Sequence, residues 1–383
     1  MQKHRVLLLS EGFGAGHTQA AYALSSSLRK VEPHVQTKVL ELGSFLNPRV
    51  APIIITAYKK TVSSQPRLVR MMYRSNYKKS LNRLTTLALH RMFYTRTIQV
   101  IRHLHPDVIV CTHPIPSTII SRIKRLEMLD VPLCTVITDY DAHGSWVSRE
   151  VNSYLVSTEQ VKQKLLERGV DESKIRITGI PVHPNFWERH RKEDIRAQFG
   201  LKNMPTVLVM GGGWGFMKDE AVNSHLASYR DRIQIIFCFG NNEKSLEKMK
   251  KDPRFLHEHI HLLGFTKEID KLMEVSDLLI TKPGGMTCTE GLAKGIPMLF
   301  HKPLPGQEEE NSHYFASQGW GTQISSLDDI TAWIDRLCNN YDEVIREREK
   351  VLDQIESFYP LQSAQAIMEL IGQNEELKDC PSY

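Results

Sequence analysis

The 383-residue chain lacks several features that would assign it to a membrane-spanning, secreted or zinc-binding class. No apolar run approaches the roughly 18–20 residues of a membrane-spanning helix. The apolar run after the first five residues is far too short for the core of a signal peptide. The six cysteines show neither close pairing nor Cys-x-x-Cys spacing, so we expect buried, reduced thiols in a cytoplasmic protein and no zinc site; they are Cys111, Cys134, Cys238, Cys288, Cys338 and Cys380.

Acidic residues are absent between Glu41 and Asp107, and this interval holds twelve lysines and arginines. Subtracting these twelve from the 49 basic residues leaves 37 against 44 acidic residues, a balance of −7. One basic segment, residues 42–106, is therefore carried by a neutral-to-acidic protein.

Apolar residues are interleaved with the charges of the basic segment, above all at residues 52–58 (PIIITAY). This mixture is typical of an amphipathic element on an anionic membrane surface. The residues expected to contact the membrane are Lys59, Lys60, Arg70, Arg74, Lys78, Lys79 and Arg83. A solvated basic helix face is the alternative interpretation, and no nucleic-acid-binding module fits the segment.

Short apolar runs alternate with longer helical patterns, which predicts an α/β protein with parallel sheets. Strands are expected at residues 6–9, 35–40, 107–111, 133–138, 153–156 and 175–178, and again at 207–210, 233–239, 260–263, 278–280 and 297–300. The length suits two domains. We expect an N-terminal domain at 1–184, a C-terminal domain at 185–340, and helices at 341–383 that end in a frayed polar tail from residue 373.

A glycine-rich turn at residues 12–16 follows the first predicted strand and ends at His17. The dinucleotide-binding pattern requires a third glycine at position 17, and a P-loop requires a Gly-Lys-Ser/Thr that is missing. The turn instead brings an imidazole to the carboxyl edge of the sheet, where histidine is suited to take a proton from a hydroxyl near neutral pH. A histidine that only caps its own helix is the alternative.

Asp139 ends another predicted strand of the same half, so it is expected to face the same edge and either orient His17 or act as a base itself. Trp146 follows a Gly-Ser turn and is expected to lie exposed near that edge. Asp139 and Asp141 have the spacing of a metal-binding D-x-D motif, but they lie outside the half expected to bind an anion, so we interpret the spacing as chance.

The stretch at residues 281–311 carries the strongest signal in the second half. Gly284 and Gly285 allow close approach of a ligand, and Thr287 and Thr289 are expected to cap a helix that begins there. Such a helix would direct its N–H groups at an anion, with Glu290 one turn in as an acceptor for a diol. A second loop, PLPGQEEEN at residues 303–311, suits sugar hydroxyls. An ordinary strand–turn–helix unit with an acidic solvated loop is the alternative.

Several motifs, taken in order, resemble one family. They are the turn with His17, ITD at 137–139, TGIPVHP at 178–184, GGG at 211–213, KPGGMTCTE at 282–290 and PLPGQEEEN at 303–311. Together they are similar to the processive diacylglycerol glucosyltransferases of Gram-positive bacteria and the plant monogalactosyldiacylglycerol synthases, within glycosyltransferase family 28. The resemblance covers roughly residues 6–337.

The resemblance implies the GT-B fold, in which two Rossmann-like domains face each other across a cleft and the last helices cross back to the N-terminal domain. It implies catalysis by His17 or Asp139 and acceptor contacts by Gly16 and Trp146. The implied donor-binding residues are Gly211, Gly212, Gly213, Gly264, Phe265, Gly284, Gly285, Met286, Thr287, Glu290, Gln307 and Glu308. Residues 214–217 and 140–144 depart from the family pattern, which leaves acceptor identity and processivity open.

The resulting hypothesis is an inverting hexosyltransferase, without metal or other cofactor, that moves glucose or galactose from a UDP-sugar to diacylglycerol at the cytoplasmic membrane face. Helix N-termini aimed at the leaving diphosphate would take the place of a metal. A UDP-sugar epimerase of the same fold and a non-catalytic UDP-sugar sensor are the alternatives. Incubation without acceptor distinguishes the epimerase, and absence of product with any acceptor distinguishes the sensor.

Overall fold

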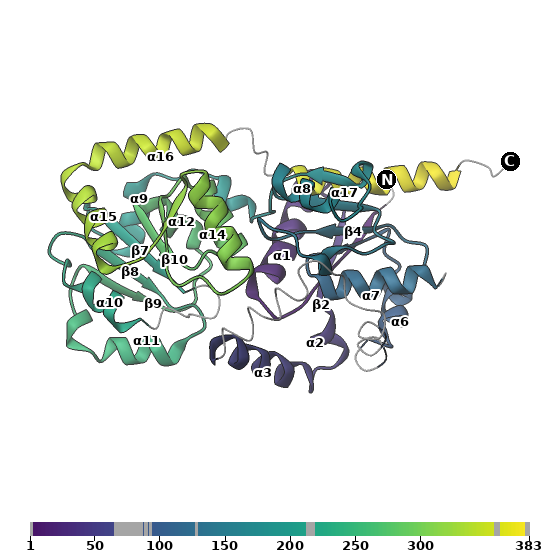
Figure 1. Cartoon of the computed structure of the whole chain (residues 1–383), viewed down its shortest axis with the longest axis horizontal. Coiled ribbons are helices and arrows are strands. Elements are labelled where there is room, and N and C mark those ends of the chain that lie inside the picture. The colour runs from purple at the N-terminus through teal and green to yellow at the C-terminus, as the bar shows by residue number, and fades with distance from the viewer. Residues whose placement is uncertain are drawn as a thin grey trace. The chain divides into compact units, whose positions relative to one another are not determined.

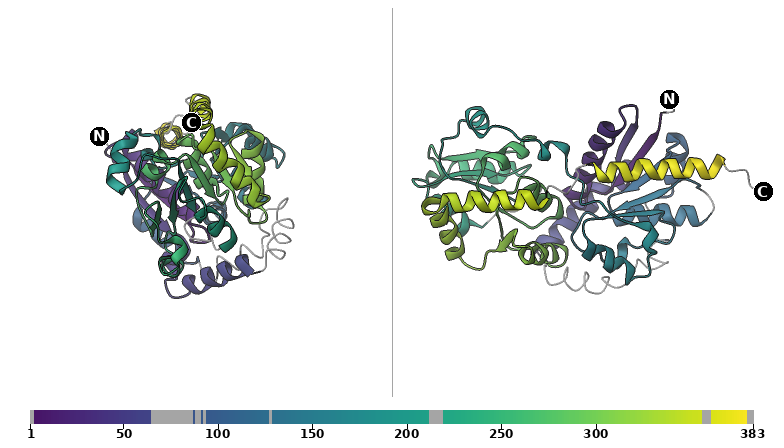
Figure 2. Two further views of the ribbon diagram at one scale, coloured as in Figure 1. Left: turned by 90° about the vertical axis from the view of Figure 1, so that its left-hand side faces the viewer. Right: turned by 90° about the horizontal axis from the view of Figure 1, so that it is seen from above.

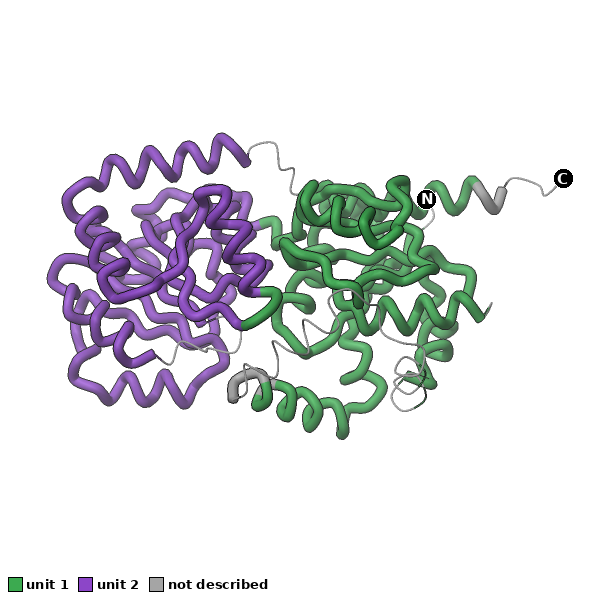
Figure 3. Tube along the Cα trace, viewed as in Figure 1, with its two compact units in different colours: residues 1–184, 305–307, 358–383 green, residues 185–304, 308–357 purple. Residues whose placement is uncertain are grey.

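The computed structural model describes residues 3–64, 87, 91, 94–126, 129–211, 219–355 and 361–379. The chain forms two compact units (Figure 3). The first comprises Met1–Pro184, Pro305–Gln307 and Phe358–Tyr383, and the second comprises Asn185–Leu304 and Glu308–Ser357. Among the site residues expected from the sequence, Gly212, Gly213, Arg70, Arg74, Lys78, Lys79 and Arg83 lie outside the described residues.

The first unit is built on a six-stranded parallel sheet of order β2-β1-β3-β4-β5-β6. Its strands are β1 (Arg5–Ser10), β2 (Gln36–Glu41), β3 (Val108–Cys111), β4 (Leu133–Val136), β5 (Ser153–Val156) and β6 (Ile175–Ile177). Its helices are α1 (Ala15–Val31), α2 (Leu42–Leu46), α3 (Ala51–Ser64), α6 (Thr97–Leu104), α7 (Pro114–Arg125), α8 (Glu159–Leu166) and α17 (Gln362–Asp379) (Figure 1).

Alternate residues of the buried strands pack on opposite faces of this sheet, as the period of two requires. Leu8 and Val110 lie in one cluster with Leu24 and Leu28 of α1 and Ile367 of α17. Their sequence neighbours on β1 and β3 belong to another cluster, which includes residues of α6, α7 and α8. The helix α17 therefore lies beside α1 (Figure 2), although the two are more than 300 positions apart in the sequence.

The second unit repeats the architecture with a parallel sheet of order β12-β11-β10-β7-β8-β9. Its strands are β7 (Thr206–Met210), β8 (Gln234–Cys238), β9 (Ile260–Leu263), β10 (Leu278–Thr281), β11 (Met298–Phe300) and β12 (Gly321–Gln323). Its helices are α9 (Lys192–Phe199), α10 (Glu220–Ala227), α11 (Glu243–Lys250), α12 (Ile269–Val275), α13 (Gly285–Ala293), α14 (Gln307–Ser317), α15 (Leu327–Asn339) and α16 (Tyr341–Ile355).

The strand orders place a topological switch point in each sheet. In the first unit the chain goes from β1 to β2 on one side and then to β3 on the other, so the switch lies between β1 and β3. In the second unit it lies between β7 and β10. Open parallel sheets bind ligands at the carboxyl ends of strands beside such a point. The candidate sites are therefore expected in the loops that follow β1, β3, β7 and β10.

The predicted α/β fold is confirmed, and three local expectations are wrong. The short edge strand β12 was missed because its residues, GTQ, carry no apolar run. Residues 373–379 are not a frayed tail, since α17 continues to Asp379 and is held by buried residues such as Ile371; the rest of the predicted tail lies outside the described residues. Residues 307–311 are the start of α14 rather than a loop, because glutamates in a first helical turn favour the positive end of the helix.

Four of the five described cysteines are buried, and none of the five forms a disulfide with another described residue. Within the described part of the chain, no helix combines the length and the apolar character needed to cross a bilayer.

Candidate active site

His17 lies in the first turn of α1, directly after the glycine turn that ends β1. Its Nδ1 atom lies 3.0 Å from the backbone oxygen of Thr112 and 2.7 Å from Oγ1 of Thr138. In return, the Thr112 hydroxyl donates to the backbone oxygen of His17 at 2.8 Å. The loops after β1, β3 and β4 thus meet at one imidazole, which lies at the switch point of the first sheet.

These contacts determine which ring nitrogen of His17 can act as a base. A carbonyl oxygen only accepts hydrogen bonds, so Nδ1 carries the proton that it donates to Thr112. The lone pair is therefore on Nε2. Removal from water lowers the pKa of His17 to about 4, so the ring is neutral at physiological pH. The alternative of a helix-capping histidine is wrong, because the N-cap of α1 is Gly14 and no side chain caps it.

The residues that hold His17 are Thr112 and Thr138, neither of which was predicted from the sequence. Asp139 was expected as one candidate for that role, but the hydrogen bonds of His17 go to the two threonines. Both threonines follow a strand end, so their position was the signal that could have identified them. Asp139 itself is buried, and its backbone oxygen accepts a hydrogen bond from Ser157 at 2.9 Å.

Trp146 is fully buried, so the expectation of an exposed tryptophan is wrong. Its ring centroid lies 6.0 Å from that of His17 and 6.0 Å from that of His143. The indole packs inside the first unit because the short helix at Gly144–Trp146 turns it toward the hydrophobic cluster beneath the sheet. Its Nε1 atom has no hydrogen-bond partner among the described residues.

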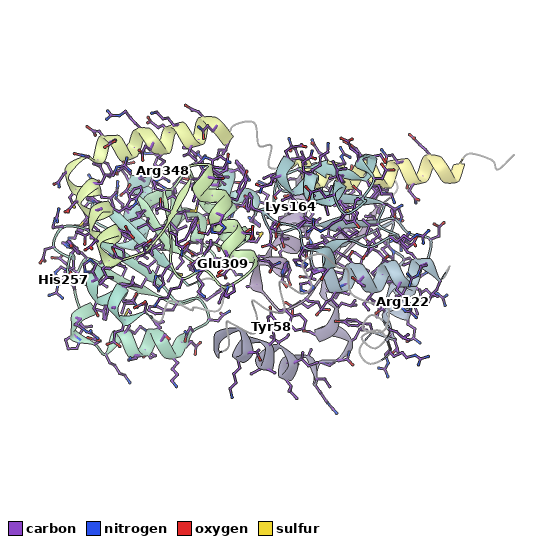
Figure 4. All side chains as sticks on the ribbon, viewed as in Figure 1. Tyr58, Arg122, Lys164, His257, Glu309 and Arg348 are labelled. Atoms are coloured by element: carbon purple, nitrogen blue, oxygen red, sulfur yellow. The ribbon has the colours of Figure 1, made fainter. Side chains whose placement is uncertain are left out.

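Two further histidines accompany His17. The ring centroid of His113 lies 4.7 Å from that of His17, edge to face. Burial lowers the pKa of His113 well below its usual value, and burial lowers that of His143 to about 4. Three neutral imidazoles therefore surround this edge of the first sheet. The neighbouring Asp141 is buried and forms an ion pair with the partly exposed Lys164 (labelled in Figure 4).

In the second unit, the candidate anion site is the start of α13. The N-cap is Gly284, and no side chain caps the helix, so the expected capping by Thr287 and Thr289 is wrong. The hydroxyl of Thr289 instead donates to the backbone oxygen of Gly285 at 2.7 Å. A side chain added at Gly284 would meet no heavy atom within 4 Å. The first N–H groups of α13, including those of Gly285 and Met286, are thus free of side-chain caps, which is the geometry of an anion site.

Glu290 lies one turn into α13 and is half-buried. Its carboxyl group makes no hydrogen bond to any other described residue. Burial, with a contribution from the charge of Asp270, raises the pKa of Glu290 to about 7. A carboxyl group kept partly out of water with no partner is suited to accept hydrogen bonds from a diol.

Lys282 and Glu308 flank the start of α13. Burial lowers the pKa of Lys282, opposed by the charge of Glu308, and burial raises that of Glu308. One carboxylate oxygen of Glu308 accepts a hydrogen bond from the N–H of Leu304 at 2.6 Å, which shapes the loop before α14. Gln307 is the first residue of α14. Lys282, two residues before Gly284, was not among the residues expected from the sequence to bind a ligand.

The remaining donor candidates also follow strand ends. Gly211 follows β7 and is buried. Gly264 and Phe265 follow β9, and the Phe265 side chain is 64% exposed. Within the described part of the chain, no group of three or more metal-ligating side chains is placed to hold an ion.

Comparison with known proteins agrees with the two-domain α/β fold. Residues 17–182 match the model of monogalactosyldiacylglycerol (MGDG) synthase, and residues 206–370 match that of the glycosyltransferase family 28 C-terminal domain. The processive diacylglycerol β-glucosyltransferase of Bacillus pumilus is 30% identical over 375 residues, covering 97% of this chain and 96% of that protein.

Two solved structures show the same fold at low identity. A crystal structure of Anabaena Alr3699/HepE in complex with UDP and glucose has a TM-score of 0.59, 13% identity, and coverage of 97% of this chain and 100% of that one. The putative UDP-N-acetylglucosamine 2-epimerase from Listeria monocytogenes has a TM-score of 0.60, 14% identity, and coverage of 100% and 99%.

Two parallel Rossmann-like sheets, each with its candidate site at a switch point, define a glycosyltransferase of the GT-B class. Within that class the chain belongs to glycosyltransferase family 28, in the group that includes the processive diacylglycerol β-glucosyltransferases.

Proposed function

We propose that the protein transfers a hexose, glucose in preference to galactose, from a UDP-sugar to diacylglycerol or a glycosyl-diacylglycerol. The observation that best supports the proposal is the full-length similarity to a diacylglycerol glucosyltransferase. Each unit also contains a candidate site with chemistry that the reaction needs. The first unit holds a neutral imidazole with a free Nε2 lone pair. The second holds an uncapped helix start beside an unpartnered carboxyl group.

The donor is assigned to the second unit. The diphosphate lies against the N–H groups of Gly284, Gly285, Met286 and Thr287, with Lys282 adding positive charge. Glu290 accepts hydrogen bonds from the uridine ribose, and Phe265 and Gly264 flank the uracil. Gly211, Gly212 and Gly213 are proposed to contact the diphosphate, and Gln307 and Glu308 to contact the sugar.

The chemistry is one displacement with inversion at the anomeric carbon. Nε2 of His17 takes the proton of the acceptor hydroxyl as that oxygen attacks. The bond from the anomeric carbon to the diphosphate breaks, and the helix start with Lys282 stabilises the negative charge on the leaving UDP. We propose that these fixed dipoles make a metal unnecessary, so EDTA is expected to leave the rate unchanged.

The acceptor and the membrane are assigned to the first unit. Gly16 and Trp146 are proposed to border the acceptor, and Asp139 to assist His17. Helix α3 bears Lys59 and Lys60, and the nearby side chains of Phe45, Val50, Ile53 and Tyr58 are exposed. Exposed apolar side chains on a stretch that also contains lysines suit the cytoplasmic face of an anionic membrane, where the protein would lie peripherally.

The test uses labelled UDP-glucose and UDP-galactose, each with diacylglycerol liposomes, followed by extraction and analysis of the lipids. Label in a glycosyl-diacylglycerol, more from UDP-glucose, is expected. Absence of labelled lipid with both donors would refute the proposal.

A UDP-sugar epimerase is the second candidate, favoured by the fold it shares with the Listeria protein. Because that likeness concerns the fold alone, an arm without acceptor is included. Conversion of the UDP-sugar in that arm would favour the epimerase, and tight donor binding without any product would favour a sensor.

A further inference from the structure

Glu11 is a buried acidic residue that the proposed reaction does not use. It follows β1 directly and is 2% exposed. Burying a carboxyl group is costly unless its oxygens accept hydrogen bonds. Its Oε1 atom accepts one from the Tyr94 hydroxyl at 2.8 Å and one from the Gly43 N–H at 2.9 Å. This one oxygen of Glu11 therefore binds both Gly43 and Tyr94. In the sequence these two residues lie on either side of residues 44–93 of the basic segment.

Gly43 lies very close to both Glu11 and the Tyr94 hydroxyl. A Cβ atom at this position would lie 2.8 Å from Oε2 of Glu11 and 3.2 Å from the Tyr94 hydroxyl. Any side chain at position 43 would displace the Glu11 carboxyl group or Tyr94. The contact among these three residues therefore requires glycine at position 43. Tyr94 is itself buried, at 4% exposure.

Helix α3, which lies within the enclosed stretch, packs on the glycine turn that precedes His17. A Cβ atom at Gly12 would lie 2.9 Å from Cδ1 of Ile55. The ring of Phe13 contacts that of Tyr58 edge to face, with centroids 5.2 Å apart, and Tyr58 lies on α3 (Figure 4).

The same turn reaches His17 through one intermediate ring. Phe13 stacks on His113 with centroids 5.9 Å apart, and His113 contacts His17 at 4.7 Å. His113 is fixed in turn, because its Nδ1 atom accepts the N–H of Ile115 at 3.2 Å at the start of α7. A displacement of α3 is therefore transmitted by packed rings to the imidazole.

We propose that Glu11 is a positioning residue for His17: its carboxyl group anchors Gly43 and Tyr94, and thereby holds α3 against the glycine turn. This inference rests on the proposed function. Glu11 does not contact a reacting atom. It sets where α3 lies, and α3 sets the turn from which His17 projects. Helix α3 is also the helix proposed to contact the lipid. Glu11 would therefore couple lipid contact by α3 to the position of His17.

The test compares Glu11→Ala, Glu11→Gln, Tyr94→Phe and the wild-type protein. Misplacement of a catalytic group by about 1 Å costs up to about 10²-fold in rate. Glu11→Ala is therefore expected to lower kcat about 10- to 100-fold, and Tyr94→Phe about two- to tenfold, as the loss of one hydrogen bond predicts. The affinity for UDP-glucose is expected to stay unchanged, and Glu11→Gln, which keeps an acceptor oxygen, to restore most of kcat.

The matched control is Tyr341→Phe in the second unit, which loses a tyrosine hydroxyl bonded to a carboxylate, Asp277, at the same 2.8 Å. It is expected to keep kcat. Equal loss of kcat in Tyr341→Phe and Tyr94→Phe, or no rescue by Glu11→Gln, would overturn the positioning role.

Hydrogen exchange gives a readout that needs no activity. In Tyr94→Phe, amides of residues 12–17 and of α3 are expected to exchange faster together, while those of β5 stay unchanged. Unchanged exchange of residues 12–17 and of α3 in Tyr94→Phe would refute the proposal that Glu11 and Tyr94 hold these segments in place. A wild-type protein that transfers no sugar but shows the linked exchange would refute the proposed function alone.

Discussion

The two units contain the same device, a glycine turn at a strand end that leads into a helix without a side-chain cap, yet they use it differently. In the first unit the turn is crowded by Ile55, Tyr58 and His113, and the first turn of α1 is occupied by an imidazole. In the second, Gly284 faces open space, and Glu290 has no partner among the described residues. A crowded turn can hold a reactive side chain in place, whereas an open one leaves its N–H groups to a ligand.

The largest effect is expected from a substitution in the first unit, which should lower turnover without changing donor binding. His17→Ala is expected to lower turnover about 10²–10⁴-fold, because a positioned general base contributes that much, and to leave UDP affinity unchanged. Steady-state kinetics and calorimetry check the two halves of this prediction. The exposed His34 supplies the control, since His34→Ala is expected to behave as wild type. Normal turnover in His17→Ala would remove this residue from the mechanism.

The basic segment tests whether the first unit also meets the lipid. Reversal of Lys78, Lys79 and Arg83 to glutamate removes about 1 kcal/mol of surface attraction per residue and adds repulsion. Binding to anionic liposomes is expected to fall at least about 100-fold in a sedimentation assay. Donor affinity is expected to remain, and liposome binding that persists would count against membrane contact by this segment.

A smaller effect is expected at the second site. Glu290→Ala removes a charged hydrogen-bond acceptor worth about 1.5–3 kcal/mol, so UDP affinity is expected to fall about 10- to 100-fold. Calorimetric titration with UDP measures this, and Glu349→Ala, an exposed carboxylate on α16, is the control. Equal affinity in Glu290→Ala and wild type would refute the ribose assignment.

The smallest effect concerns pH and stability. Burial is the largest cause that raises the pKa of Glu11 to about 7; the Tyr94 hydroxyl and the Gly43 N–H oppose it, and the charge of Glu41 adds to it. The folded state therefore holds a proton that the unfolded state releases above about 4.5. This stabilises the protein at low pH, and the contribution is lost as the pH rises through about 7.

Glu11→Gln mimics the protonated form, so it removes this dependence. Its Tm relative to wild type is expected to be higher at pH 8 than at pH 5, by on the order of a few degrees. Thermal unfolding at both pH values measures the difference. The same relative Tm at both would contradict the raised pKa of Glu11.

The sequence predicted the elements better than their contacts. Apolar runs located eleven of the twelve strands in the described part of the chain, because buried parallel strands are continuously hydrophobic. Strand order does not follow from such runs, so the switch points were found only in the structure. The glycine turns predicted where His17 and Glu290 would lie. Thr112 and Thr138 were missed because the sequence does not show which strand ends meet, and Trp146 was misplaced because one aromatic residue after a turn gives no signal of burial.

The most direct test of the proposed roles of the two units, acceptor activation in the first and donor binding in the second, is to identify the reaction product. With α-linked UDP-glucose and diacylglycerol liposomes, wild-type protein is expected to release UDP and form a β-linked glucosyl lipid in equal amounts, with or without EDTA. The coupling constant of the anomeric proton in the purified lipid reports the linkage. An α-linked product would contradict direct attack by an acceptor deprotonated at His17, and UDP release without glucosyl lipid would contradict transfer to diacylglycerol.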